Sequence, residues 1–340
     1  MTPEPATARR ASGDGDTVQA DASVLLELYR RMATIRRAEE RLSQLFADGA
    51  VPGFLHLSIG QEAVPVGVCA ALEPADTVAS THRGHGHALA KGMALEGFFA
   101  EIMGRASGVC AGRGGSIHVA DMSIGMLGAN GIVGGGLPLA AGSALAHQVK
   151  GRPNVAVAFF GDGAMAEGAL HECLNLARLW KLPLVFVCEN NGWGEFSPLE
   201  RQFAAKLAAL GAAFAIPYEE VDGIDVEAVA AAAQRRIEPA RRGEGPQILE
   251  CFTQRWRGHY EGDPQKYRDP SNLDAARGQD ALAVAAGRLA AQGIGAARLA
   301  RLERSIAEHI ETAVTAARAA AEPDFETALA GVYAGGRAHG

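Results

Sequence analysis

Two polar side chains stand just after two apolar runs in the middle of the chain, and their types suit a metal ion. Asp162 follows the run 154–160, and Asn191 follows the run 182–189. A carboxylate oxygen and an amide oxygen are hard ligands, and the backbone carbonyl of Trp193 offers a third oxygen. Three protein oxygens suit Mg²⁺, which completes its octahedron with water and phosphate oxygens.

The residues around the first of these side chains favour an anion beside the metal. Gly161 and Gly163 let the backbone approach a ligand closely. The N–H groups of Gly163 and Ala164 are expected to open a helix, whose N-terminus favours negative charge. The predicted ligand is therefore a diphosphate bridged by magnesium. A nicotinamide site fits less well, because the next glycine, Gly168, comes too late for the dinucleotide-binding turn.

The elements that must position these side chains are two strands and one helix. Both apolar runs are continuous rather than alternating, which is typical of strands buried on both faces of a parallel sheet. The segment 166–181 between them has apolar residues at helical spacing. A right-handed crossover makes the strands parallel, so both polar residues lie at the carboxyl edge, where α/β sheets bind ligands. The predicted fold is α/β, a parallel sheet with helices on both faces.

Two further basic clusters follow predicted strands. Histidines and an arginine form the run 82–87 after the strand 76–81, and a second cluster follows the strand 246–253. Zinc is an alternative for the first cluster, but no carboxylate or thiol set stands beside it. Arg83 can fork onto phosphate oxygens, so an anion site is favoured. The second cluster contains Arg255 and His259.

A glycine-rich segment, 108–136, lies between the first two strands and predicts a functional loop or a linker. The following helix, 138–147, has small side chains and a proline near its start. Small side chains allow close helix packing, so this helix is expected at a subunit interface.

The Gly-Asp-Gly triplet, the helix and the strand ending in Asn-Asn together resemble the thiamin diphosphate signature. Asp162 and Asn191 are 29 positions apart, which matches the spacing of that family. Over residues 21–335 the chain resembles the α subunit of the two-subunit, thiamin-dependent component of 2-oxo-acid and acetoin dehydrogenase complexes. Its fold, reaction and cofactors are therefore expected here.

The resemblance implies roles for individual residues. His259 and His56 are candidates for proton transfer, and His56 ordering only its own loop is the alternative. His82 stands where the family often has tyrosine, and it keeps a hydrogen-bond donor for the diphosphate. The residues expected to bind thiamin diphosphate are His82, Arg83, Gly131, Ile132, Val133, Asp162, Gly163, Ala164, Asn191, Arg255 and His259. Those expected to hold Mg²⁺ are Asp162, Asn191 and Trp193.

The resemblance also implies partners, because no carboxylate in this chain matches the one that activates the cofactor. In the family that glutamate belongs to a β subunit, so an α2β2 heterotetramer is expected, working with a lipoyl-bearing acyltransferase. The runs 80–87, 127–136 and 256–264 look closer to acetoin than to pyruvate dehydrogenases. Acetoin is the expected substrate, with pyruvate or another 2-oxo acid as the alternative. A nicotinamide-dependent dehydrogenase and a non-catalytic relative remain as other classes.

Composition sets broader limits. The chain has 340 residues, 48% hydrophobic, and a net charge of −7, which argues against a nucleic-acid partner. No apolar run has membrane-spanning length. Five scattered cysteines are typical of reduced thiols in a cytoplasmic protein. Residues 1–20 are expected to be a disordered tail, and 21–340 a single domain that includes C-terminal helices over about 273–335.

Overall fold

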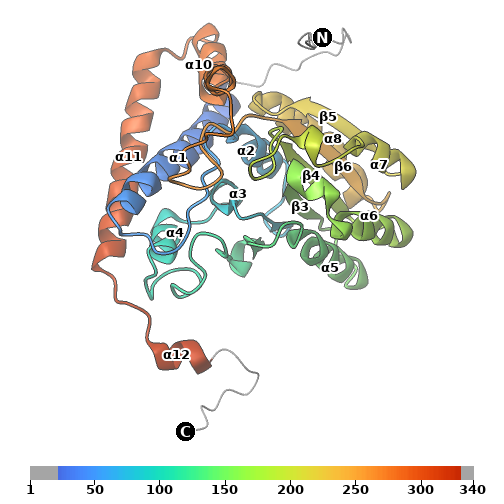
Figure 1. The fold of residues 1–340 in the computed structure, drawn as a ribbon, viewed down its shortest axis with the longest axis horizontal. Coiled ribbons are helices and arrows are strands. Elements are labelled where there is room, and N and C mark those ends of the chain that lie inside the picture. The colour runs from blue at the N-terminus through green and yellow to red at the C-terminus, as the bar shows by residue number, and fades with distance from the viewer. Residues whose placement is uncertain (1–21, 331–340) are drawn as a thin grey trace.

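The computed structural model describes residues 22–330, so the predicted tail lies outside the described residues. A six-stranded sheet forms the centre (Figure 1), and all its neighbouring strands pair in parallel. The strand order is β2-β1-β3-β4-β6-β5. The strands are β1 (Thr77–Ala79), β2 (Met126–Gly128), β3 (Ala156–Gly161), β4 (Leu184–Asn190), β5 (Tyr218–Asp222) and β6 (Gln247–Phe252). The parallel α/β prediction is confirmed.

Alternate residues of β3 and β4 feed two separate cores, which is why both runs are apolar throughout. Ala158 and Phe160 pack under α5 (Gly136–Val149), α6 (Gly168–Trp180) and α7 (Leu207–Ala213). Val157 and Phe159 join the larger core on the other face. Its helices are α1 (Ala22–Ala47), α2 (Ala63–Ala70), α3 (Gly84–Lys91), α4 (Leu95–Ile102), α8 (Val226–Arg241), α10 (Ala281–Ala291) and α11 (Ala296–Ala319).

The C-terminal helices close the side of this larger core. The α11 helix packs on α1 and α4, and Figure 1 shows it in orange along the outside of the molecule. The side chains of Asp225 and Asp280 accept hydrogen bonds from backbone N–H groups in the first turns of α8 and α10, and they cap the N-termini of these helices. The remaining elements are η1 (Met122–Ile124), η2 (Asp162–Ala166), η3 (Leu199–Arg201), α9 (Pro270–Arg277) and α12 (Phe325–Ala330).

One sequence expectation about local structure is wrong. Gly163 and Ala164 open the short 3₁₀ turn η2, and the α-helix begins only at Gly168. The backbone of Glu167 is extended (φ −76°, ψ 134°), which separates the turn from the helix. The backbone N–H groups predicted to bind an anion therefore belong to a tight turn and not to the N-terminus of an α-helix.

The glycine-rich segment is a loop rather than a linker, because it stays within the domain. Between residues 108 and 135 it forms only η1 and the short edge strand β2. None of the helices within residues 22–330 is both long and apolar enough to cross a membrane. All five cysteines are free thiols.

Candidate active site

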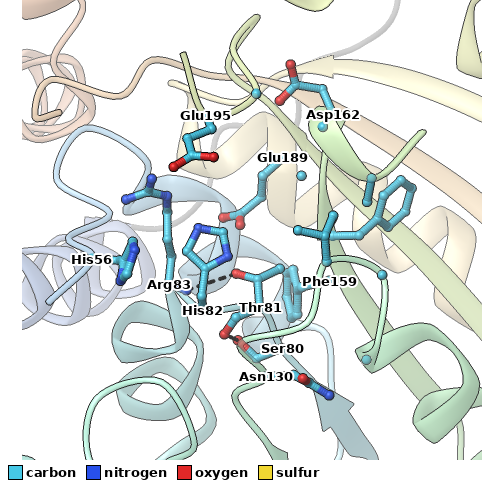
Figure 2. A pocket seen from close by; sticks show the side chains of 18 of the residues that line it. His56, Ser80, Thr81, His82, Arg83, Asn130, Phe159, Asp162, Glu189 and Glu195 are labelled. Atoms are coloured by element: carbon cyan, nitrogen blue, oxygen red, sulfur yellow. Dashed lines mark hydrogen bonds between the residues drawn. The ribbon is translucent and has the colours of Figure 1, made fainter. Parts of the chain in front are cut away.

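A cavity of about 460 Å³ opens at the carboxyl edge of the sheet (Figure 2). Its walls come from the ends of β1, β3 and β4 and from the loops that follow β2 and β6. Every residue that the sequence assigns to cofactor, metal or catalysis lines it: His56, His82, Arg83, Gly131, Ile132, Val133, Asp162, Gly163, Ala164, Asn191, Trp193, Arg255 and His259. Segments more than 200 positions apart in sequence thus meet at one edge.

Asp162 is buried at the end of β3, and neither carboxylate oxygen has a hydrogen-bond partner of normal geometry. Burial raises the pKa of Asp162 to about 6, while nearby backbone N–H groups and Arg255 act in the opposite direction. A buried carboxylate without a partner is costly, so this side chain is suited to binding a cation. The donor set therefore fits Mg²⁺.

Asn191 lies partly buried beyond β4, where two contacts orient its amide. The Nδ2 group donates to Oε1 of Gln61 at 3.0 Å, and Oδ1 accepts the N–H of Trp193 at 3.1 Å. An amide oxygen has two lone pairs, so Oδ1 keeps one for a metal. Gln61 was not predicted as a site residue, because its role depends on a contact across 130 positions.

Arg83 and Arg255 bring two guanidinium groups into the cavity wall, and both side chains are buried. Burial, with the charge of Arg255 second, lowers the pKa of Arg83 to about 9. Arg83 donates to the carbonyl oxygens of Leu57 and His259, each at 2.7 Å. Arg255 leaves Nε and Nη2 without partners. Two neighbouring cations without a paired carboxylate suit a dianionic ligand, and Arg255 has the freer donors.

Three imidazoles gather beside these cations. The ring centroid of His56 lies 4.9 Å from that of His82 and 5.2 Å from that of His259. The centroids of His82 and His259 are 5.4 Å apart. Burial is the main cause that lowers the pKa of His56 to about 4, that of His259 to about 3, and that of His82 well below its usual value. The positive field of Arg83 comes second in each case. All three rings are neutral at pH 7.

The other histidines of the run 82–87 have structural partners. His85 contacts Glu39 at 3.1 Å and Ser116 at 2.8 Å, while His87 shares a 2.6 Å hydrogen bond with Ser80. The rings of this run therefore do not converge on one point. The described residues contain no group of three or more His, Cys, Asp or Glu side chains placed to hold a metal ion, and the zinc alternative receives no support there.

The glycine-rich loop forms the outer rim of the cavity. The side chains of Ile132 and Val133 are 73% and 49% exposed, although both are apolar. The Oδ1 atom of Asn130 accepts the N–H of Ile132 at 2.9 Å and fixes this turn. Apolar side chains held at the mouth of a cavity are typical of a surface that another molecule covers.

Two buried or partly buried carboxylates organise the loops, and no local sequence pattern predicted either role. Asp263 accepts the N–H of His259 at 2.7 Å and the hydroxyl of Tyr267 at 2.5 Å. Glu101, fully buried in α4, accepts four backbone N–H groups of the glycine-rich loop, those of Cys110, Gly112, Gly114 and Gly115. Each carboxylate holds a loop in one conformation, so neither role is visible as a local motif.

The cavity lies at the carboxyl edge of a parallel α/β sheet, which is where enzymes of this class bind their ligands. Its paired guanidiniums and unpartnered carboxylate suit a phosphorylated cofactor with a metal ion. Residues 30–326 match the dehydrogenase E1 component family, and the chain belongs to that family. The family implies thiamin diphosphate as the cofactor, as the resemblance had indicated.

Individual relatives cover nearly the whole chain. The α subunit of the acetoin:2,6-dichlorophenolindophenol oxidoreductase of Bacillus subtilis is 48% identical over 310 residues, which is 91% of this chain and 93% of the relative. The protein of the same name from Cupriavidus necator is 45% identical, with 95% and 98% covered. The pyruvate dehydrogenase E1 component subunit alpha of Zymomonas mobilis is 42% identical, with 93% and 90% covered.

Proposed function

We propose that this chain is the α subunit of a thiamin diphosphate-dependent dehydrogenase that cleaves acetoin. The enzyme releases acetaldehyde and transfers the acetyl unit to a lipoyl group of a partner acyltransferase. The observation that carries this proposal is the identity of 45–48% to two acetoin oxidoreductase α subunits over nearly the full length of each chain. The cavity supports it, because it brings together the groups that such a cofactor requires.

In this proposal Arg83, Arg255 and the η2 turn would hold the diphosphate of the cofactor. Asp162, Asn191 and the backbone carbonyl of Trp193 hold Mg²⁺, and Asp162 is suited to this because its oxygens have no other partner. The glycines of the turn keep side chains away from the phosphate oxygens. The backbone of Gly131, Ile132 and Val133, which line the cavity, would hold the aminopyrimidine ring.

Thiamin diphosphate, when bound, supplies the carbon nucleophile that attacks the substrate carbonyl. The residues of this chain bind, orient and move protons. His259 is the proposed proton-transfer residue nearest the reaction, and its neutral ring carries its proton on Nε2 because Nδ1 faces a donor of Arg83 at 3.3 Å. His56 is the second candidate, because its Nδ1 is buried without a partner.

The carboxylate that activates the cofactor is proposed to come from a β subunit. The exposed apolar rim formed by Ile132 and Val133 supports a partner at the mouth of the cavity. We propose an α2β2 heterotetramer on this basis. The five free cysteines support a reducing compartment such as the cytoplasm.

A pyruvate-oxidising α subunit is the second candidate, and the 42% identity to the Zymomonas mobilis protein favours it. Co-expression with a β chain decides between the two. Acetoin, pyruvate and a branched 2-oxo acid are compared as substrates, with 2,6-dichlorophenolindophenol as electron acceptor. Acetoin is expected to give the highest kcat/KM, and a higher value for pyruvate would overturn the primary proposal. Turnover by the isolated chain would overturn the proposal that the active site is shared with a β subunit.

A further inference from the structure

The three imidazoles in the cavity come from three separate segments and converge on one space. His56 lies in the loop before α2, His82 follows β1, and His259 lies in the loop after β6. The planes of His82 and His259 are tilted by 44°, and that of His56 stands nearly perpendicular to both. In Figure 2, His56 and His82 are seen on the same side of the cavity as Arg83.

Two ring nitrogens of this cluster have no partner in the protein, whereas Nδ1 of His259 faces Nη2 of Arg83. Nδ1 of His56 and Nε2 of His82 are buried and have no hydrogen-bond partner. Nε2 of His259 lies 4.0 Å from Oε1 of Glu195, whose side chain is 59% exposed. Unpaired buried nitrogen atoms cost free energy, which a ligand with matching groups would recover.

The charge state of the cluster defines which ligand matches. Burial and the two nearby guanidiniums keep the three rings uncharged, so they offer single N–H donors and nitrogen acceptors. Among the described residues that line the cavity, the arginines are Arg83 and Arg255, and no lysine is present. The proposed function assigns both guanidiniums to the diphosphate, so no other arginine or lysine among the described lining residues is left for a substrate carboxylate.

We propose that His56, His82 and His259 form a neutral substrate subsite that selects uncharged α-hydroxyketones over 2-oxo carboxylates, with His82 as its specificity-determining residue. The inference rests on the proposed function and extends it. A hydroxyl and a carbonyl on adjacent carbons need one acceptor and one donor, which neutral imidazoles provide. A carboxylate there would be desolvated against uncharged rings, which is costly. His82 thereby contacts substrate rather than the diphosphate.

The test uses the co-expressed α and β chains with two variants. His82→Phe keeps a planar ring but removes both nitrogens, and His82→Gln keeps an amide donor and acceptor. For each enzyme, kcat/KM is measured with acetoin and with pyruvate. The dissociation constant of thiamin diphosphate with Mg²⁺ is measured separately by tryptophan fluorescence, since Trp193 lines the cavity.

We expect His82→Phe to lower kcat/KM for acetoin by about 10- to 100-fold, the loss of one buried hydrogen bond. The value for pyruvate should change by less than about threefold, and His82→Gln should restore part of the preference. Cofactor affinity should stay within about threefold of the wild type. Thermal unfolding and co-elution with the β chain verify that the variants fold and assemble.

Two results would overturn the subsite. One is an unchanged acetoin-to-pyruvate ratio in His82→Phe. The other is a tenfold or greater loss of cofactor affinity without a change in that ratio, which would make His82 a diphosphate ligand. The substrate preference of the wild type tells failure of the proposed function apart from failure of the subsite. If the wild type prefers acetoin and the ratio does not move, only the subsite is wrong; if it prefers pyruvate, the proposed substrate and the subsite both fail.

Discussion

Nη2 of Arg83 lies 3.3 Å from Nδ1 of His259 and donates a 2.7 Å hydrogen bond to the carbonyl oxygen of the same residue. Because a guanidinium only donates, Nδ1 must accept, and the proton of the neutral ring is on Nε2. One arginine thus sets the tautomer of the proposed proton-transfer residue and also faces the proposed diphosphate site. Cofactor binding and proton transfer share this side chain.

Replacing Arg83 by lysine is expected to weaken both properties together. An ammonium keeps the charge but cannot span the carbonyl of Leu57 and both His259 contacts at once. We expect a 10- to 100-fold loss of cofactor affinity and at least a tenfold loss of kcat, measured by titration and steady-state kinetics. The control is Arg257→Lys, an exposed arginine of the loop that carries His259. Unchanged kcat in Arg83→Lys would show that His259 does not depend on this contact.

Replacing Asp162 by asparagine is expected to raise the stability of the chain and to weaken cofactor binding. The unpartnered carboxylate, with its pKa raised to about 6, costs on the order of 3 kcal/mol at neutral pH. The neutral isostere should therefore raise the thermal midpoint of the cofactor-free chain. It should also reduce Mg²⁺-dependent cofactor binding by about 100-fold or more, because the anionic ligand is lost.

The control for this experiment is Glu172→Gln, which removes an exposed carboxylate from α6. It should change neither the thermal midpoint nor cofactor affinity. If Asp162→Asn bound the cofactor with Mg²⁺ as tightly as the wild type, the assignment of the metal site would be wrong.

Replacing Asp263 by alanine is expected to loosen the loop that carries His259. Asp263 accepts the backbone N–H groups of His259 and Gln265 and the hydroxyl of Tyr267. Gly258 packs against it, and a Cβ atom there would lie 2.5 Å from Cβ of Asp263. Loss of these contacts should lower kcat about tenfold.

The thermal midpoint in this variant should fall by only a few degrees, because the loop lies outside the main core. Asp274→Asn, on the exposed face of α9, serves as the control. Faster cleavage of the loop by a protease would provide a readout independent of turnover. Equal cleavage rates in the variant and the wild type would contradict the loop-ordering role.

The sequence predicted the cavity because its main signals are local. Continuous apolar runs mark strands buried on both faces, and Asp162 and Asn191 stand immediately beyond two such runs. Parallel neighbours bring their carboxyl ends to one edge, so position along the chain predicts position in space. The register confirms this, since Gly161 pairs with Glu189.

What the sequence did not predict depends on contacts between distant segments. Gln61 contacts Asn191 across 130 positions, and Glu101 accepts four backbone N–H groups from residues 110–115. A polar residue on an amphipathic helix gives no sign of whether it is buried. The meeting of His56, His82 and His259 likewise requires the loops to be placed in space. The helix start was predicted too early, because the extended backbone of Glu167 has no clear sequence signal.

The pH dependence of stability is expected to reflect the neutral imidazoles. In the folded chain the pKa of His56 is about 4 and that of His259 about 3, whereas the unfolded value is about 6.5. Between these values the unfolded chain binds more protons, so the free energy of unfolding rises with pH across this window. This contribution is complete above pH 6.5 and is lost as the pH falls, down to about 4 for His56 and about 3 for His259.

Asp162 acts in the opposite direction, since its folded pKa of about 6 exceeds its unfolded value. The contribution of a histidine is therefore measured by comparing the wild type with a variant that lacks that histidine. We expect the thermal midpoint of the cofactor-free wild type to fall between pH 7 and pH 5 by a few degrees more than that of His56→Gln, which cannot take up the proton. His309→Gln, an exposed histidine on α11, is the control and should follow the wild type. Parallel curves for the wild type and His56→Gln would show that His56 is not held neutral by the fold.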